Sequence, residues 1–260
     1  MWNDTWAASD VAGRFVGDYY ESLQGRVRAH LITSHLREHL PHSPAELVDV
    51  GGGAGHQAIP LAREGHRVTL VEPSAAMLEQ AEARLAEEPA EVRDRVALVH
   101  ASGEDAVAAT GSRTFEAVLC HAVVQYVDDP TLLVRALGDL AGPGAVVSVM
   151  TKNQLAMPMP HVAGGEWAEA LASFDEDRMV CGLGMPTRAD TPDGLMAQLD
   201  AVGVDTVAWY GVSFFTDWWG GRRPAADATP ELLATELEAS RRDPYRQLGR
   251  MIHVVGRRRG

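Results

Sequence analysis

The chain has 260 residues, of which 46% are hydrophobic and 23% are charged, so it can bury a full core as one globular domain. Its 36 acidic residues outnumber its 23 basic ones and give a formal net charge of −13. Phosphate contacts need clustered positive charge, so this balance disfavours a large nucleic-acid footprint.

The cysteines and the distribution of apolar residues indicate the cellular compartment. Cys120 and Cys181 stand in apolar surroundings and predict reduced side chains without a disulfide framework. The first residues lack the basic start and apolar core of a signal peptide, and no apolar run approaches transmembrane length. We therefore expect a cytoplasmic protein that does not contact a membrane.

Residues 1–44 predict two helical pieces, the second over about 25–40. From Leu47 onward, β-branched runs alternate with amphipathic segments, and Ser74 is a suitable helix N-cap. The pattern predicts strands over 47–50, 67–72, 96–100, 115–120 and 145–151, and helices over 56–64, 74–88, 104–109 and 130–141. Such alternation predicts a doubly wound, mostly parallel α/β sheet with right-handed crossovers.

The alternation stops at 152–190, a segment rich in Met, Pro and Gly. We predict an irregular insertion there with one short helix near Trp167–Phe174. The segment follows a strand's carboxyl end, where open α/β sheets bind substrates, so we expect a lid or a wall of the acceptor pocket.

The rest of the chain completes a seven-stranded sheet. We predict a helix over about 191–202, a strand over 204–215, a helix over 230–240 and a last strand over 249–257. The expected single domain then has four parts: an N-terminal helical cap over 1–44, a cofactor-binding core over 45–151, the insertion over 152–190 and the completion over 191–260.

A glycine loop follows the strand over 47–50. Glycines 51, 53 and 55 alternate with other residues, and lacking Cβ atoms they let the backbone turn sharply and approach a ligand. Glu72 lies 21 residues after Gly51, where a βαβ nucleotide site places its ribose-binding acid. This combination predicts a site for an adenosine-containing cofactor.

Two cofactor classes use such a loop. A dinucleotide site needs a third glycine at position 56, which is His56. The pattern Asp49-x-Gly51-x-Gly53-x-Gly55 instead resembles the first motif of the Rossmann-like S-adenosylmethionine-dependent methyltransferases. The resemblance implies S-adenosylmethionine as cofactor, with its methionine end held by Asp49 and the backbone of Gly51, Gly52, Gly53 and Gly55, and its ribose by Glu72.

The same resemblance extends to two later segments. Glu104 and Asp105 follow the third strand, where methyltransferases place acids near the adenine amino group. The alternative is a helix start whose acids favour the dipole. His121 follows the fourth strand and would face cofactor or acceptor, the alternative being a buried, satisfied histidine.

One further pattern matches a metal-binding motif. His35, Glu38 and His39 match the inverted zinc-protease motif His-x-x-Glu-His. This segment precedes the nucleotide fold and no third ligand is evident, so we expect no metal site.

Several stretches resemble one methyltransferase family more closely. These enzymes, the tRNA uridine-5-oxyacetic acid methyltransferases, methyl-esterify the carboxymethoxy group of wobble uridine. The matching stretches include residues 25–28, 51–57, 75–77, 121–123, 184–186, 243–245 and 248–254. The likeness implies that Arg28 binds the donor's carboxylate, and a guanidinium does match a carboxylate bidentately.

Departures from that family concern the acceptor. Residues 187–191 are nearly neutral where the family tends to have a lysine-rich run, and Ser213 stands where it tends to have arginine. With the net charge, this favours methyl transfer to an O, N or carboxylate group of a small molecule. Esterification of tRNA and non-catalytic binding of S-adenosylmethionine are the alternatives. A carboxylate acceptor needs no base, whereas a hydroxyl or an amine would, and His121 is the candidate catalytic base.

Overall fold

The computed structural model describes residues 19–260 except 21, 43, 182–183 and 219–227. The first predicted helical piece therefore lies mostly outside the described residues. Seven strands form the central sheet in the order β3-β2-β1-β4-β5-β9-β8. Their bounds are β1 Glu46–Val50, β2 Arg67–Glu72, β3 Val96–His100, β4 Phe115–His121, β5 Ala141–Lys152, β8 Val204–Val212 and β9 Met251–Arg258. The first five strands pair in parallel, and β9 is antiparallel to both β5 and β8. The predicted seven-stranded, mostly parallel sheet is confirmed.

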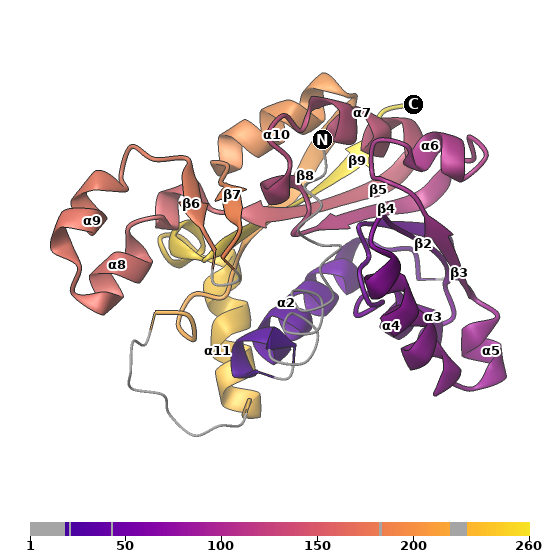
Figure 1. The fold of residues 1–260 in the computed structure, drawn as a ribbon, viewed down its shortest axis with the longest axis horizontal. Coiled ribbons are helices and arrows are strands. Elements are labelled where there is room, and N and C mark those ends of the chain that lie inside the picture. The colour runs from indigo at the N-terminus through magenta and orange to yellow at the C-terminus, as the bar shows by residue number, and fades with distance from the viewer. Residues whose placement is uncertain (1–18, 21, 43, 182–183, 219–227) are drawn as a thin grey trace.

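Helices cover both faces of this sheet. Figure 1 shows α6, α7 and α10 on one face and α2, α3, α4 and α11 on the other. The helices of these layers are α2 Leu23–His39, α3 Ala58–Arg63, α4 Ala75–Ala86, α5 Ala90–Arg93, α6 Ala106–Ala109, α7 Thr131–Leu140, α10 Pro192–Ala201 and α11 Pro230–Arg241. Each face has its own apolar core, one gathered around Leu133, Leu137 and Leu195 and the other around Leu31 and Leu47. Burial of these side chains is the main source of the fold's stability.

Helix ends follow the sequence closely. The side chain of Ser74 accepts a hydrogen bond from the Met77 amide, as the N-cap prediction requires. Ser22 caps α2 in the same way through the amide of Gly25 at 3.1 Å. Among the described residues, no helix combines the length and apolarity needed to cross a bilayer.

The insertion is more regular than predicted. Besides the expected helix, α9 (Trp167–Ala172), it contains α8 (Met159–Gly164) and a small hairpin of β6 (Arg178–Val180) and β7 (Pro186–Arg188). The prolines at 158 and 160 start α8 because the first turn of a helix needs no amide donor. Figure 1 shows α8 and α9 projecting beyond the edge of the sheet.

Candidate active site

The site lies where the carboxyl ends of β1 and β4 meet, next to β2. The amides of Gly51 and Gly52 donate to the carbonyl of Val71, at 2.7 and 3.3 Å, and thereby tie the glycine loop to β2. Gly51 has a φ of +71°, and a Cβ there would lie 2.4 Å from Cγ2 of Val123. Only glycine fits such a position, so the loop rests directly on the segment that follows β4.

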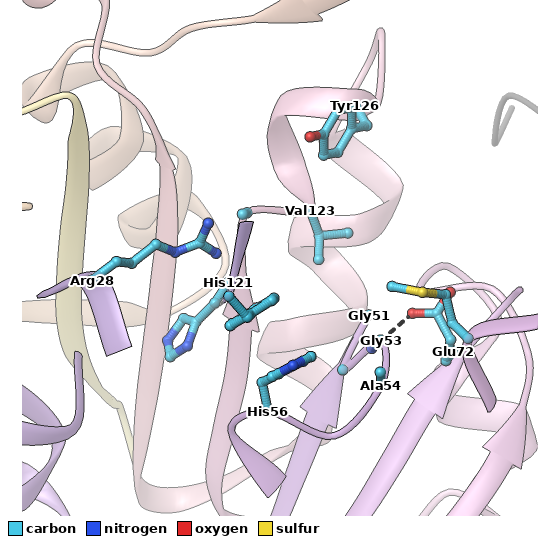
Figure 2. A pocket seen from close by; sticks show the side chains of 13 residues that line it. Arg28, Gly51, Gly53, Ala54, His56, Glu72, His121, Val123 and Tyr126 are labelled. Carbon is cyan, nitrogen blue, oxygen red and sulfur yellow. Dashed lines mark hydrogen bonds between the residues drawn. The ribbon is translucent and has the colours of Figure 1, made fainter. Parts of the chain in front are cut away.

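A cavity opens beside this loop. Figure 2 shows Arg28 and His121 toward one end of it and Glu72 toward the other, with Gly51 and Gly53 between them. Of the predicted residues, the cavity brings together Arg28, Asp49, Gly51, Gly52, Gly53, Glu72 and His121. These residues come from α2, β1, the glycine loop, β2 and β4, so the fold assembles one site from distant segments.

Glu72 ends β2 and is 5% exposed. Its Oε2 accepts from the Gly53 amide and its Oε1 from the Ser74 amide, both at 3.0 Å (Figure 2 shows the first). Burial raises the pKa of the Glu72 carboxyl, and the two amide donors partly offset that effect. The carboxylate is thus fixed in place at the rim of the loop.

Asp49 lies deeper and is 2% exposed. Its Oδ2 has no hydrogen-bond partner in the described part of the chain. Burial, and to a lesser extent the charge of Glu72, raises the pKa of Asp49 to about 7. A buried carboxylate oxygen without a donor favours a ligand that brings one.

Arg28 supplies a buried positive charge from α2. Its guanidinium lies 5.5 Å from the ring centroid of Tyr19. Burial lowers the pKa of this group, but Tyr19 and Tyr20 outweigh burial and keep the pKa above its usual value. Arg28 therefore remains charged and suits an anionic ligand group.

His121 ends β4. Its Nε2 lies 2.8 Å from the hydroxyl of Ser148, while its Nδ1 is buried and has no partner among the residues described. Burial, helped by the charge of Arg28, lowers the pKa of His121 to about 3, so the imidazole is neutral at physiological pH. The Arg28 guanidinium and two polar atoms without a partner among the described residues, Oδ2 of Asp49 and Nδ1 of His121, thus line the same cavity. A cation beside a buried carboxylate complements a ligand that bears both a carboxylate and an ammonium group.

Three predicted residues do not line this cavity. Gly55 has a φ of +77° and packs against Ile59, so it shapes the turn. The exposed carboxylate of Asp105 accepts from the Ser102 hydroxyl at 2.8 Å, and Glu104 stands beside it after β3. A role for Glu104 and Asp105 at an adenine ring stays a prediction.

Sequence reasoning missed several lining residues, and those with large side chains are Tyr20, His56, Met77 and Tyr126. In the sequence, His56 served only to exclude a dinucleotide motif, which needs glycine at that position. In the structure its ring stacks on that of Tyr20, with ring centroids 3.4 Å apart. A histidine directly after a glycine loop is the sequence signal that could have indicated this part of the cavity lining.

Comparison with known proteins finds similarity to methyltransferases. A family described as "Methyltransferase domain" matches residues 48–147. The tRNA 5-carboxymethoxyuridine methyltransferase of Escherichia coli (strain K12) is 29% identical over 252 residues, which are 96% of this chain and 95% of that protein. A ubiquinone biosynthesis O-methyltransferase of Methylocella silvestris is 35% identical over 134 residues, covering about half of each chain.

Solved structures share the fold. The CcbJ methyltransferase of Streptomyces caelestis aligns with a TM-score of 0.66 at 14% identity and covers 100% of both chains. The glycopeptide N-methyltransferase MtfA, solved in complex with S-adenosylmethionine, aligns with a TM-score of 0.54 at 16% identity over 88% of this chain and 93% of MtfA. With S-adenosylmethionine as its methyl donor, the chain is a Rossmann-like methyltransferase that resembles the tRNA 5-carboxymethoxyuridine methyltransferases over nearly its whole length.

Proposed function

We propose that this methyltransferase transfers its methyl group to the carboxylate of a small acid and forms a methyl ester. The observation that carries the proposal is the state of His121, whose pKa of about 3 makes it a weak base. A hydroxyl or an amine must lose a proton to a base of suitable pKa, whereas a carboxylate is already ionised at neutral pH. Asp49, with a pKa near 7, is assigned below to the donor's ammonium group, so with His121 a weak base the site suits a carboxylate acceptor.

The charges in the cavity support a position for the donor. Arg28 would bind the α-carboxylate, and Asp49 would accept from the α-ammonium with its unpartnered Oδ2. Glu72 would take the ribose hydroxyls, and Glu104 or Asp105 the adenine amino group. S-adenosylmethionine supplies an activated methyl group on a sulfonium. Holding donor and acceptor in line can lower the barrier by roughly 7–11 kcal/mol.

The surface charges favour a small acceptor over a polyanion. Many described arginines already pair with carboxylates of this same chain, which leaves them less available for phosphates. They are Arg37, Arg63, Arg67, Arg178, Arg188, Arg241, Arg242, Arg246, Arg250 and Arg259. Together with the net charge of −13, this pairing disfavours a long electrostatic contact with RNA.

A second candidate is the carboxymethoxy group of tRNA. Its support is the 29% identity to the tRNA 5-carboxymethoxyuridine methyltransferase over 96% of this chain. Both candidates offer the same chemical group, a carboxylate, and the product of both is a methyl ester.

The test uses S-adenosylmethionine labelled in its methyl group. The purified chain is incubated with a panel of small carboxylic acids or with bulk tRNA that carries carboxymethoxyuridine without its methyl ester, and the labelled product is then exposed to mild alkali. We expect alkali-labile label in the small-molecule fraction, because esters hydrolyse under conditions that leave methyl ethers and methylamines intact. Alkali-labile label in the RNA would establish the second candidate, and alkali-stable label would refute both. Intact donor binding without any transfer would identify a non-catalytic binding protein.

A further inference from the structure

A chain of buried hydrogen bonds runs from the cavity into the core between the sheet and the helices α2 and α11. We call it the buried polar chain, and its members are His121, Ser148, His253, His35 and Ser240. The hydroxyl of Ser148 lies 2.8 Å from Nε2 of His121 and 2.6 Å from Nε2 of His253. Nδ1 of His253 lies 3.2 Å from Nδ1 of His35, whose Nε2 is 2.9 Å from the hydroxyl of Ser240. Beyond His121, each member is at most 2% exposed.

Strand register explains how the buried polar chain forms. Leu119 of β4 is opposite Ser148 of β5, and Met150 of β5 is opposite His253 of β9. Because side chains alternate along a strand, His121, Ser148 and His253 share one face of the sheet. On that face, α2 contributes His35 and α11 contributes Ser240.

Once donor and acceptor are known for one hydrogen bond of the buried polar chain, they are fixed for all the others. Burial lowers the pKa of His35, His121 and His253, so each imidazole is neutral and has one N–H and one lone pair. The Ser240 hydroxyl donates to the carbonyl of Leu237 at 2.7 Å and therefore accepts from His35.

The remaining tautomers follow in order. His35, protonated on Nε2, accepts at Nδ1 from Nδ1–H of His253. His253 then accepts at Nε2 from the Ser148 hydroxyl, which accepts in turn from Nε2–H of His121. This order leaves the lone pair of His121 on Nδ1.

The opposite direction is less favourable. It would put the His121 proton on Nδ1, which is buried and has no acceptor in the part of the chain that is described. It would also remove the bond to the Leu237 carbonyl. A buried N–H without an acceptor costs the desolvation of a donor, and such donors are rarer in proteins than under-used acceptors.

We infer that Ser148, His253, His35 and Ser240 are positioning residues that hold His121 in its Nε2–H tautomer, so that Nδ1 accepts a hydrogen bond from the ammonium group of the methyl donor. The inference rests on the donor placement proposed above. The α-carboxylate and α-ammonium of the donor share one carbon atom, so the ammonium must lie close to the group that binds the carboxylate. Arg28, His121 and Asp49 line the same part of the cavity, and the last two each present an unpartnered acceptor atom.

The first test reads the tautomer directly in the unaltered chain. Nitrogen NMR of the protein labelled with ¹⁵N-histidine distinguishes protonated from bare ring nitrogens, and His121→Gln assigns the signals of His121. We expect a protonated Nε2 and a bare Nδ1 in the free protein. A protonated Nδ1 would overturn the inference whatever the activity.

The second test reverses the tautomer and then restores it. In His253→Phe the Ser148 hydroxyl loses its acceptor on residue 253, and of its two hydrogen-bond partners only His121 Nε2 remains. We expect the hydroxyl to donate there, which moves the His121 proton to Nδ1. We expect the Kd for S-adenosylmethionine to rise about tenfold or more, as for the loss of a hydrogen bond to a charged group. In Ser148→Ala/His253→Phe that hydroxyl is absent, so the Kd should return to within about threefold of the original value.

Recovery of the Kd when Ser148→Ala is added to His253→Phe distinguishes a positioning role from a general loss of structure. If both substitutions only disturbed the structure, their effects on the Kd would add. Ser148→Ala alone leaves His121 free to take either tautomer without forcing the wrong one, so we expect its Kd for the donor to rise by no more than about threefold. Thr110→Val is the matched control, since it removes a buried hydroxyl that donates to the Ala106 carbonyl at 2.8 Å outside the buried polar chain.

The outcomes separate the two proposals. Unchanged affinity in His253→Phe, or no recovery in the double variant, would overturn the inference. If Arg28→Met and Asp49→Asn then still abolish binding, the proposed donor site stands without it. If those two variants also bind normally, the donor placement itself is wrong. Should His253→Phe not fold, the tautomer of the unaltered chain decides.

Discussion

At the scale of single residues, the site contains buried polar atoms that have no hydrogen-bond partner among the described residues, Oδ2 of Asp49 and Nδ1 of His121. Asp49 is the clearest case, because burial holds its pKa near 7 against an ordinary value of 3.8. A group in that state costs stability whenever it is forced to ionise. Because a bound ammonium group would favour the ionised form of Asp49, binding of the donor and loss of the Asp49 proton are coupled.

Asp49→Asn should stabilise the free protein at pH 8 and weaken donor binding. Below about pH 3, Asp49 is protonated in both the folded and the unfolded chain and does not affect the free energy of unfolding. As the pH rises from about 4 to about 7, the unfolded chain is ionised at Asp49 while the folded one stays protonated, so the free protein loses stability, and above about pH 7 the loss is complete. Asparagine avoids this loss, which we expect to be about 2–4 kcal/mol at pH 8.

Denaturant unfolding at pH 4 and pH 8 measures this difference, and calorimetry measures the affinity for S-adenosylmethionine. The exposed Asp94→Asn serves as the control and should leave both quantities unchanged. A stability gain of equal size at both pH values would contradict the burial argument.

Residue-level prediction from the sequence had a clear limit. Asp49, Glu72 and the loop glycines are close in sequence and form a recognisable pattern, so their gathering in one cavity was predictable. His121 was identified from its place after β4, but its partners were not. His253 lies 132 residues further along the chain, and only strand register brings it to Ser148.

At the scale of elements, strands and caps were predicted well because their signals are local. β-branched runs and a serine N-cap act within a few residues, and β2 and β3 have the predicted bounds. The hairpin of β6 and β7 was missed because each strand has three residues, too few to show an alternating pattern. Its pairing is a tertiary property of the insertion.

The fit between the glycine loop and the segment after β4 gives a prediction for Gly51. Gly51→Ala should destabilise the fold more than Gly144→Ala does. Both glycines have positive φ, +71° and +78°, so both alanines suffer the left-handed backbone cost of about 1–2 kcal/mol. At Gly144 the new Cβ meets nothing within 4 Å, whereas at Gly51 it meets Val123 at 2.4 Å.

We expect the clash at Gly51 to add about 1–3 kcal/mol, as overpacking does in closely packed sites. The free energies of unfolding of the two variants, measured in denaturant, give the difference directly. Equal values would mean that the loop does not rest on Val123 in solution.

At the scale of the whole molecule, an excess of acids coexists with arginines of which about half of those described pair with carboxylates of the same chain. Arg259, for example, contacts both Asp200 and Asp205, and Arg246 pairs with Asp243. Such exposed pairs contribute little to stability, with typical values of about 0–1 kcal/mol each. Their larger effect is on recognition, because they reduce the positive potential that a polyanion would encounter.

This charge distribution predicts how acceptor binding responds to salt. A small acid carries one or a few charges, so raising the salt from about 50 to about 200 mM should change its KM less than about threefold. A tRNA held by 6–10 phosphate contacts would instead lose about 10³–10⁵ in affinity over the same range. The KM for the acceptor, measured at saturating S-adenosylmethionine across that range, separates the two cases. The Kd of the donor is the internal control, because its charges bind inside the cavity and should respond little. A steep loss confined to the acceptor would show that the paired arginines exchange their carboxylates for phosphates, and it would move the proposed acceptor from a small acid to tRNA.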